Sequence, residues 1–371
     1  MSLTIVADDK IPFLRGVFEP FATVKYLSGK NISPADLSDA DALIVRTRTK
    51  CNKALLQNSS VRFVATATIG FDHINTVELE ELGIRWTNAP GCNADSVKNY
   101  ISSALAAMDC DLTGKTLGVI GVGHVGSRVA AAGAALGMKV LLNDPPRAEK
   151  EGNEQFVELD ELLAESDIVT LHVPLTENCK YPTLQMADAD FFNKMRHGAW
   201  FFNSCRGETV EVQSFLTAGK SGHIGGALMD VWPGEPDIAA ELLDAVEFAT
   251  PHIAGYSTDG KANGTTAAVR YIAEKLGIDQ LRNWSPEKLP EPVFDPEIIL
   301  DRNMTLQQAL KSAILHAYDI RNDVSALRNA PDKFEFLRGS YWVRREFSAY
   351  TVHNAPERAV KSLQQLGFHT A

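Results

Sequence analysis

The chain has 371 residues, which at roughly 150 residues per domain predicts two or three domains. Its 47 aspartates and glutamates outnumber its 36 lysines and arginines, and the formal charge of -11 provides no overall positive field to attract nucleic acid or an anionic membrane. Hydrophobic residues make up 45% of the chain and charged residues 22%, which excludes disordered and fibrous proteins.

The first part of the chain alternates short apolar runs with helical or turn-rich stretches. Runs rich in β-branched residues, typical of parallel strands joined by crossovers, lie at Leu3–Ala7, Ala42–Arg46 and Val61–Thr66. A helix is predicted from about Asp95, a candidate N-cap. Four apolar residues recur on one face of that helix: Val97, Ile101, Leu105 and Met108.

From Thr116 the alternation of strands and helices restarts. Further strands are predicted at Thr116–Ile120, Lys139–Asn143, Ile168–Val173, Ala199–Asn203 and Gly226–Asp230. The first of them is followed by a helix with an apolar face made of Val125, Val129, Ala132 and Leu136. This pattern predicts a second doubly wound unit, in which helices cover both faces of a parallel sheet.

A third unit is predicted near the C-terminus. Ser285–Pro296 contains four prolines and is interpreted as a linker, because proline interrupts helices. A long amphipathic helix is expected over Leu306–Val324, a strand over Tyr341–Val352, and a last helix from Asn354 with Glu357 as a capping-box residue. The apolar face of the long helix must be buried, either in a two-fold dimer or against its own chain.

The cysteines indicate a reducing environment. The five of them include no C-x-x-C pair, which fits neither a disulfide framework nor a zinc site. No apolar stretch reaches the ~18 residues of a membrane helix, and no His-Glu-x-x-His spacing suggests a catalytic metal. We therefore expect a cytoplasmic protein with no membrane partner and no metal.

A glycine-rich motif follows the predicted strand Thr116–Ile120. In Gly121-Val122-Gly123-His124-Val125-Gly126 the first glycine permits a tight turn, the second lets the backbone approach a pyrophosphate, and the third allows close packing of helix on strand. Asp144, 23 residues after Gly121, ends the next strand, where a carboxylate can accept hydrogen bonds from ribose hydroxyls. The pattern favours NAD, while nearby Arg147 keeps NADP as an alternative. The remaining alternative is a glycine-rich turn in an unliganded sheet.

Three further residues suggest dehydrogenase chemistry. Arg206 follows the strand Ala199–Asn203, Glu235 lies in a turn just past the strand that ends at Asp230, and His252 lies in the loop Thr250–Gly255. A guanidinium at the carboxyl edge of a sheet can hold a substrate carboxylate, and a carboxylate on one ring nitrogen of a histidine raises the basicity of the other. Each residue alone also fits an ordinary surface or loop role.

These residues make the chain resemble the D-2-hydroxyacid dehydrogenase family over about residues 1 to 280. The matching stretches are Asn203–Gly207, Met229–Trp232 with Gly234–Pro236, and Thr250–Gly255. The resemblance implies that Arg206 binds the substrate carboxylate, Glu235 supports His252, and His252 is the acid/base. It also implies that Asp230 contacts the nicotinamide carboxamide and Gly255 the cofactor.

Within the family, the chain resembles a branch that acts on a phosphorylated four-carbon acid. The segments that carry this resemblance are Ala89–Ala94, Asp144–Arg147 and His252–Tyr256, together with the C-terminal extension. The resemblance implies that Thr47, Thr68 and Tyr256 contact substrate. Val173 stands where the family has a cofactor-contacting threonine, so a side-chain hydroxyl is lost there.

A basic cluster follows the predicted strand Ala42–Arg46. Arg46 and Arg48, with Lys50 nearby, are the hypothesis for the phosphate pocket, because charge-assisted hydrogen bonds suit a phosphate. The alternative is a solvated basic turn. We predict oxidation at C2, with His252 taking the hydroxyl proton and the hydride passing to the nicotinamide.

The predicted architecture is α/β: two doubly wound parallel-sheet domains of Rossmann or flavodoxin type and a smaller α+β C-terminal domain. We expect residues 1–93 and 252–284 to form a substrate-binding lid domain, 94–251 the NAD-binding domain, and 285–371 a domain that forms a homodimer, as the resemblance implies. The expected partner is a phosphorylated 2-hydroxy acid. Alternatives are a 3-phosphoglycerate dehydrogenase, a hydroxypyruvate reductase or an NAD-sensing corepressor.

Overall fold

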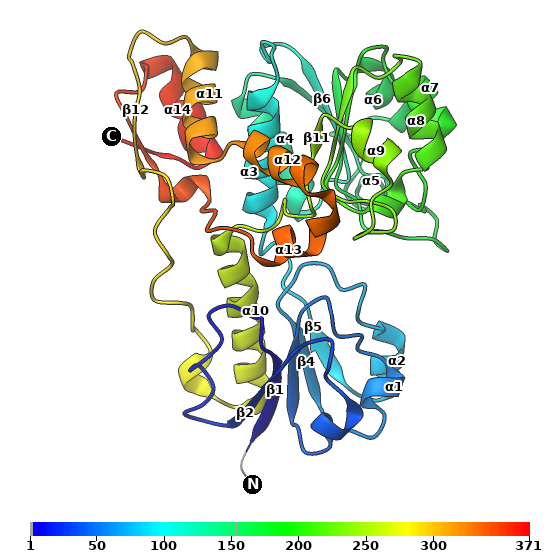
Figure 1. The fold of residues 1–371 in the computed structure, drawn as a ribbon, viewed down its shortest axis with the longest axis vertical. Helices are drawn as coiled ribbons and strands as arrows, with labels where there is room; N and C mark the ends of the chain where they lie inside the picture. The colour runs from blue at the N-terminus through cyan, green and yellow to red at the C-terminus, as the bar shows by residue number, and fades with distance from the viewer. Residues whose placement is uncertain (1–2, 153) are drawn as a thin grey trace. The chain divides into compact units, whose positions relative to one another are not determined.

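The computed structural model describes residues 3–152 and 154–371 (Figure 1). Met1 and Ser2, the first residues of the predicted lid domain, lie outside them. The chain forms two compact units: residues up to Asn93 with Thr258–Pro290, and Ala94–Ser257 with Glu291–Ala371. Both contain parallel sheets flanked by helices, so the predicted α/β fold class is confirmed. The division into three domains at 252 and 285 stays a prediction.

The first unit is built on a parallel sheet with the strand order β2-β1-β3-β4-β5. Its strands are β1 Thr4–Asp8, β2 Thr23–Leu27, β3 Ala42–Val45, β4 Phe63–Thr66 and β5 Arg85–Thr87. Its helices are α1 Lys53–Leu56, α2 Thr76–Glu81 and α10 Thr258–Leu276. The three predicted strands correspond to β1, β3 and β4, whereas β2 and β5 were not predicted.

Both faces of this sheet are buried. Ile5 and Ile44 pack in the core that contains α10, and their neighbours Val6 and Leu43 pack in a second core with α1 and α2. Because successive side chains of a strand point to opposite faces, both faces contribute apolar residues. This is why these strands are continuous apolar runs in the sequence.

Helix α10, the longest helix of the described residues, was not predicted from the sequence. Its buried face consists largely of small residues, among them Ala262, Gly264, Thr265 and Ala268, so its hydrophobic periodicity is weak. A Cβ on Gly264 would lie 2.4 Å from the carbonyl oxygen of Ala67. The close approach of helix and backbone therefore requires a small residue there.

The second unit contains a six-stranded parallel sheet in the order β11-β10-β9-β8-β6-β7. Its strands are β6 Thr116–Ile120, β7 Lys139–Asn143, β8 Ile168–Leu171, β9 Trp200–Asn203, β10 Gly226–Met229 and β11 Phe248–Ala249. The helices of this part are α3 Ala94–Ala107, α4 His124–Ala135, α5 Pro145–Glu151, α6 Leu159–Glu165, α7 Ala189–Lys194, α8 Val212–Lys220 and α9 Ala240–Asp244. Because β7 and β8 flank β6 on opposite sides, the strand order reverses at β6. Ligands of such sheets bind outside the carboxyl ends of the strands at this reversal.

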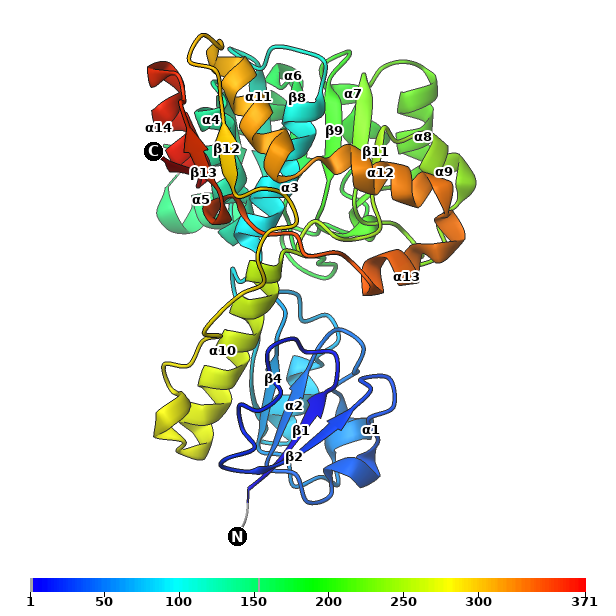
Figure 2. The same cartoon turned by 60° about the vertical axis from the view of Figure 1, so that its left-hand side comes forward.

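The C-terminal segment packs on this sheet domain within the same unit (Figure 2). It has a small parallel sheet in the order β12-β13-β14, with β12 Glu297–Ile299, β13 Thr351–His353 and β14 His369–Thr370. Its helices are α11 Leu306–Ala317, α12 Ile320–Asn329, α13 Phe334–Gly339 and α14 Glu357–Leu366. Leu310 of α11 and Leu363 of α14 share one hydrophobic core with Ile101 of α3 and Val129 of α4.

Two helix predictions need correction. The helix α3 begins at Ala94, and Asp95 lies in its first turn, where it pairs with Lys98 at 2.8 Å rather than capping the helix. The long helix expected over Leu306–Val324 is two helices, α11 and α12, which are interrupted at Tyr318. Asp319 follows and caps α12 by accepting a hydrogen bond from a backbone amide, and a capping aspartate favours a new helix start.

The predicted strand Tyr341–Val352 is wrong except for its last two residues, because only Thr351–His353 forms a strand in this described stretch. Tyr341 and Trp342, which are half-buried, donate hydrogen bonds to Asp323 instead of lining a sheet. The last helix begins at Glu357, three residues later than predicted, since Asn354 has a left-handed backbone with φ of 55°. Among the described residues, no helix combines the length and apolar character needed to span a membrane.

Candidate active site

The glycine-rich turn joins β6 to α4 at the carboxyl edge of the six-stranded sheet. Gly121 has a φ of 84°, which residues with a Cβ rarely adopt, and a Cβ there would lie 2.7 Å from the carbonyl oxygen of His172. A Cβ on Gly126 would lie 1.9 Å from the carbonyl oxygen of Gly121. The turn and its packing against α4 therefore require glycine at both positions.

Gly123 differs from these two glycines, because a Cβ there would meet no atom within 4 Å. It precedes α4, whose first residue His124 is exposed and whose second, Val125, is half-buried. The unpaired N–H groups at a helix N-terminus can bind an anion, and the open space beside Gly123 leaves room for one. This geometry fits the pyrophosphate of a dinucleotide.

Asp144 lies directly beside this turn. Its Oδ2 accepts a hydrogen bond from the amide of Val122 at 2.8 Å, and its Oδ1 accepts one from the amide of Arg147 at 3.1 Å. The Arg147 guanidinium donates to the Val122 carbonyl at 2.5 Å and pairs with Glu151 at 2.6 Å. Because Glu151 neutralises the cation considered for a 2′-phosphate, the arrangement favours NAD over NADP.

Val173 lies two residues after β8 and packs toward the glycine turn. A Cβ on Gly121 would come within 2.8 Å of the Val173 Cγ1 atom, so the valine side chain fills the space beside the turn. It supplies an apolar wall where a threonine would supply a hydroxyl. A cofactor contact by Val173 stays a prediction.

Three neighbouring strands, β9, β10 and β11, end at the same sheet edge and are followed by Arg206, Asp230 and His252. The half-buried Arg206 is anchored through its main chain, because its carbonyl accepts hydrogen bonds from Asn203 Nδ2 at 2.9 Å and Thr209 Oγ1 at 2.7 Å. Its Nη1 donates to the carbonyl of Cys205 at 2.7 Å. A forked donor is thus fixed at the edge where ligands of this fold bind.

Glu235 and His252 are in direct contact. Glu235 Oε1 lies 2.5 Å from His252 Nδ1, and about a quarter of each side chain is exposed (25% and 27%). Burial raises the pKa of Glu235, but the hydrogen bond to His252, the His252 and Arg338 charges and the Trp232 amide together bring that pKa below its usual range. A carboxylate that stays ionised on Nδ1 fixes the imidazole and directs Nε2 toward a substrate.

Asp230 holds the backbone that follows His252. Its carboxylate, 1% exposed, accepts hydrogen bonds from Thr250 Oγ1 and the Ile253 amide at 2.7 Å, and from the Ala254 amide at 2.8 Å. Burial raises the pKa of this carboxyl, with the His252 charge and these donors acting in the opposite direction. The expected contact with a nicotinamide carboxamide stays a prediction, but Asp230 clearly shapes the His252 loop.

Gly255 and Tyr256 continue the same loop and are half-buried. The Tyr256 ring packs edge-on against Tyr341, with centroids 6.2 Å apart, and the Arg338 guanidinium lies 5.4 Å from its centre. Arg338 of α13 lies in no recognisable sequence motif and was not predicted as a site residue. It brings a positive charge close to Tyr256 and affects the pKa of Glu235.

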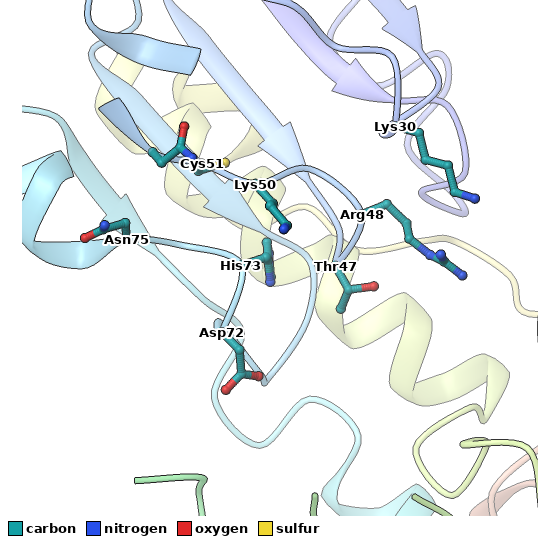
Figure 3. Close-up of a pocket in the computed structure, with 9 residues that line it drawn as sticks. Lys30, Thr47, Arg48, Lys50, Cys51, Asp72, His73 and Asn75 are labelled. Carbon is teal, nitrogen blue, oxygen red and sulfur yellow. The ribbon is translucent and has the colours of Figure 1, made fainter. Parts of the chain in front are cut away.

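The predicted substrate residues of the first unit lie at the carboxyl ends of β3 and β4. A hollow of about 730 Å³ opens there (Figure 3). The residues that line it are Lys30, Thr47, Arg48, Lys50, Cys51, Asn52, Asp72, His73 and Asn75. Thr47 and Arg48 therefore line one hollow, and their contact with a substrate stays a prediction; Lys30 and His73 also line it and were not predicted from the sequence.

Arg46 and Thr68 have other contacts and do not line this hollow. Arg46 Nη1 donates to the carbonyl of Lys10 at 3.0 Å. Thr68 Oγ1 donates to the carbonyl of Gly70 at 2.8 Å and lies 2.7 Å from Thr66 Oγ1. Arg48 and Lys50 are thus better placed for an anion in the hollow than Arg46.

Comparison with known proteins agrees with this site. Residues 92–254 match the family described as "D-isomer specific 2-hydroxyacid dehydrogenase, NAD binding domain". A Bacteroides fragilis protein named erythronate-4-phosphate dehydrogenase is 44% identical over 356 residues, covering 94% of this chain and 99% of that protein. The chain belongs to the D-2-hydroxyacid dehydrogenase family, in the erythronate-4-phosphate dehydrogenase branch. A protein of the same name from Yersinia enterocolitica is 40% identical over 376 aligned positions, covering 99% of both chains.

This D-2-hydroxyacid dehydrogenase is an NAD-dependent enzyme, as predicted. The solved structure of D-lactate dehydrogenase from Aquifex aeolicus, complexed with NAD and lactic acid, is similar to it with a TM-score of 0.61. The two are 26% identical, and the match covers 77% of this chain and 100% of that one. Residues 289–367 match a "Domain of unknown function (DUF3410)", so the C-terminal segment has a defined sequence family of its own.

Proposed function

We propose that this enzyme oxidises 4-phospho-D-erythronate at C2 to 3-hydroxy-2-oxo-4-phosphooxybutanoate, a step of vitamin B6 biosynthesis. The observation that carries the proposal is the 2.5 Å contact between Glu235 and His252 beside the strand that leads to Arg206. The names of the relatives at 38% to 44% identity support this choice of substrate.

In the proposed reaction His252 removes the proton of the C2 hydroxyl. Glu235 on Nδ1 leaves Nε2 free for that proton and stabilises the positive charge that the ring gains. Arg206 holds the substrate carboxylate, so that C2 is oriented as its carbonyl forms. When bound, NAD accepts the hydride that leaves C2.

The glycine turn with His124, Val125 and Asp144 is the proposed cofactor cradle. Gly123 faces open space at the N-terminus of α4, and the Asp144 carboxylate lies where ribose hydroxyls are bound in such sheets. Val173, Asp230 and Gly255 are proposed as contacts of the nicotinamide half. Thr47, Thr68 and Tyr256 are proposed as substrate contacts.

A panel of acids tests the proposal. Purified enzyme is given 4-phospho-D-erythronate, 3-phosphoglycerate, unphosphorylated erythronate and D-lactate, each with NAD and with NADP, and reduced cofactor is followed by absorbance. We expect the highest kcat/KM with 4-phospho-D-erythronate and NAD. A higher value with 3-phosphoglycerate would assign the enzyme to the three-carbon acids, and no reduction with any acid would support an NAD-sensing protein.

Arg48 is the proposed phosphate ligand, and its replacement gives a separate prediction. Arg48→Ala is expected to lower kcat/KM for 4-phospho-D-erythronate about 10- to 150-fold, because a charge-assisted hydrogen bond contributes about 1.5 to 3 kcal/mol. Unphosphorylated erythronate should lose much less. Arg46→Ala is the matched control and should have a smaller effect, since Arg46 donates to the Lys10 carbonyl. Equal losses on both acids would remove Arg48 from phosphate recognition.

We also propose that the enzyme is a cytoplasmic homodimer assembled through its C-terminal segment. All five cysteines are free thiols, which agrees with a reducing compartment. Ile299 of β12 and Phe336 of α13 are 75% and 66% exposed, and burial of these side chains in a dimer contact would remove apolar surface from water. Sedimentation at low protein concentration distinguishes a dimer from a monomer.

A further inference from the structure

The short segment that follows His252 is held by hydrogen bonds on both sides of its backbone. The amides of Ile253 and Ala254 donate to Asp230. The carbonyls of the same two residues accept hydrogen bonds from Arg344 Nη2, at 3.1 Å and 2.6 Å. Asp230 belongs to the sheet domain. Arg344 comes from the C-terminal segment and lies 90 residues after Ala254 in the sequence.

Arg344 is one of the largest fully buried side chains, with 1% of its surface exposed. Besides the two carbonyls, its Nη2 donates to Ser96 Oγ at 2.6 Å. Its guanidinium also lies over the Tyr318 ring, 4.5 Å from the centroid. A buried guanidinium must be matched by acceptors and by countercharge, so these contacts fix its place closely.

Two tyrosines link Arg344 to the buried carboxyl group of Asp323 in α12. Tyr318 and Tyr341 donate their hydroxyls to Asp323 Oδ2 at 2.8 Å and 2.7 Å. The guanidinium of Arg344 lies 5.5 Å from the centroid of Tyr341, and its Nη1 is 3.4 Å from the Tyr341 hydroxyl. Asp323 is 6% exposed, so the network is buried from the carboxylate to the guanidinium.

Ser257, at the end of the same segment, is also held by hydrogen bonds. Ser96 Oγ of α3 donates to the Ala254 carbonyl at 2.8 Å and accepts from the Ser257 amide at 3.0 Å. Ser257 Oγ donates to Glu346 Oε1 at 2.8 Å. Arg344 and Glu346 thus connect the C-terminal segment to both ends of the stretch after His252.

His252 itself needs such support, because its φ of 56° is a left-handed backbone conformation that non-glycine residues rarely adopt. Such a conformation persists only where the surrounding structure holds it. We propose that Arg344 is a positioning residue for His252, so that the C-terminal segment helps to build the active site of its own chain. This inference rests on the proposed role of His252 as the acid/base.

The variant Arg344→Met tests the inference, because it keeps much of the bulk and removes every donor. We expect kcat to fall about 10- to 100-fold, since a small displacement of a reacting group has effects of this size. The Kd of NAD should change less than kcat, because the glycine turn and Asp144, the proposed holders of the pyrophosphate and ribose, are not altered. Hydrogen exchange of the amides in residues 251–257 should accelerate at least about tenfold, because their backbone hydrogen bonds open more often.

Leu363→Ala is the matched control. Leu363 of α14 is fully buried in the hydrophobic core that α11 and α14 form with α3 and α4. Its truncation therefore lowers stability without removing a hydrogen bond to the His252 loop. It should lower the Tm but leave kcat and exchange in 251–257 close to wild type. Arg344→Lys, which keeps the charge and some donors, should recover part of the lost kcat.

Three results decide the inference. Wild-type kcat and exchange in Arg344→Met would overturn it, as would losses equal to those of Leu363→Ala at a matched fall in Tm. If Arg344→Met does not fold, Ser96→Ala replaces it. We expect this variant to show a smaller fall in kcat and faster exchange in residues 251–257. No change in either quantity would overturn the inference. Exchange does not require a substrate, so it remains decisive even if the wild-type enzyme oxidises no acid of the panel and the proposed function fails.

Discussion

Replacing His252 with alanine is expected to lower kcat by about 10²- to 10⁴-fold, the usual contribution of a general base. The His252 imidazole is held by Glu235 Oε1 at this edge of the sheet, where it can act as the base. Without it, the proton of the substrate hydroxyl has no acceptor as the carbonyl forms. Binding of NAD should change less than about twofold, because the glycine turn and Asp144 are unaffected.

The control for this variant is His223→Ala. His223 Nε2 contacts the Met195 carbonyl at 2.9 Å and takes no part in the proposed reaction. Its loss should leave kcat close to wild type. Glu235→Gln should give an intermediate loss, because an amide can still bond to Nδ1 but does not stabilise the charged ring. Full turnover by His252→Ala, with folding verified by its Tm, would refute the acid/base assignment.

The sequence predicts the glycine turn, Arg206 and Glu235 because each follows a strand that is a clear apolar run, whereas β11, the two-residue strand Phe248–Ala249 before His252, was not predicted. In a parallel sheet the carboxyl ends of such strands meet at one edge, so strand positions alone bring these residues into the same region. The contact between Glu235 and His252 was expected from the family resemblance and is present at 2.5 Å. Local patterns therefore carry most of this site.

The contacts that could not be predicted link residues far apart in the chain. Arg344 lies in a stretch whose aromatic residues suggested a strand, yet Tyr341 and Trp342 are directed to the buried Asp323. No periodicity distinguishes aromatic residues of a strand from those that surround a buried carboxylate. The distinction between Arg46 and Arg48 was also hidden, because it depends on the Lys10 carbonyl that binds Arg46.

Helix α10 shows a second limit of prediction from sequence patterns. Hydrophobic periodicity finds helices that bury large side chains, whereas α10 buries small ones against the backbone near Ala67. The missed helix matters for the site, because it begins directly after Ser257, where the loop that carries His252 ends. The loop is thus bounded by β11 on one side and α10 on the other.

Replacing Arg206 with methionine is expected to lower kcat/KM by about 10²- to 10⁴-fold. A guanidinium forms two parallel hydrogen bonds with a carboxylate, and two charge-assisted bonds of about 1.5 to 3 kcal/mol each give a loss of this size. The loop should keep its shape in the variant, because Asn203 and Thr209 bond to the main-chain carbonyl of Arg206 and not to its side chain. Steady-state rates with 4-phospho-D-erythronate and NAD provide the measurement.

Two further variants separate carboxylate binding from a general effect of lost charge. Arg206→Lys should be intermediate, since an ammonium keeps the charge but not the fork. Arg196→Met removes an arginine from an exposed pair with Asp167 at 2.9 Å and should leave kcat/KM close to wild type, because exposed pairs contribute little. Arg206→Lys at full activity would mean that charge alone suffices, and Arg206→Met within about threefold of wild type would contradict the carboxylate assignment.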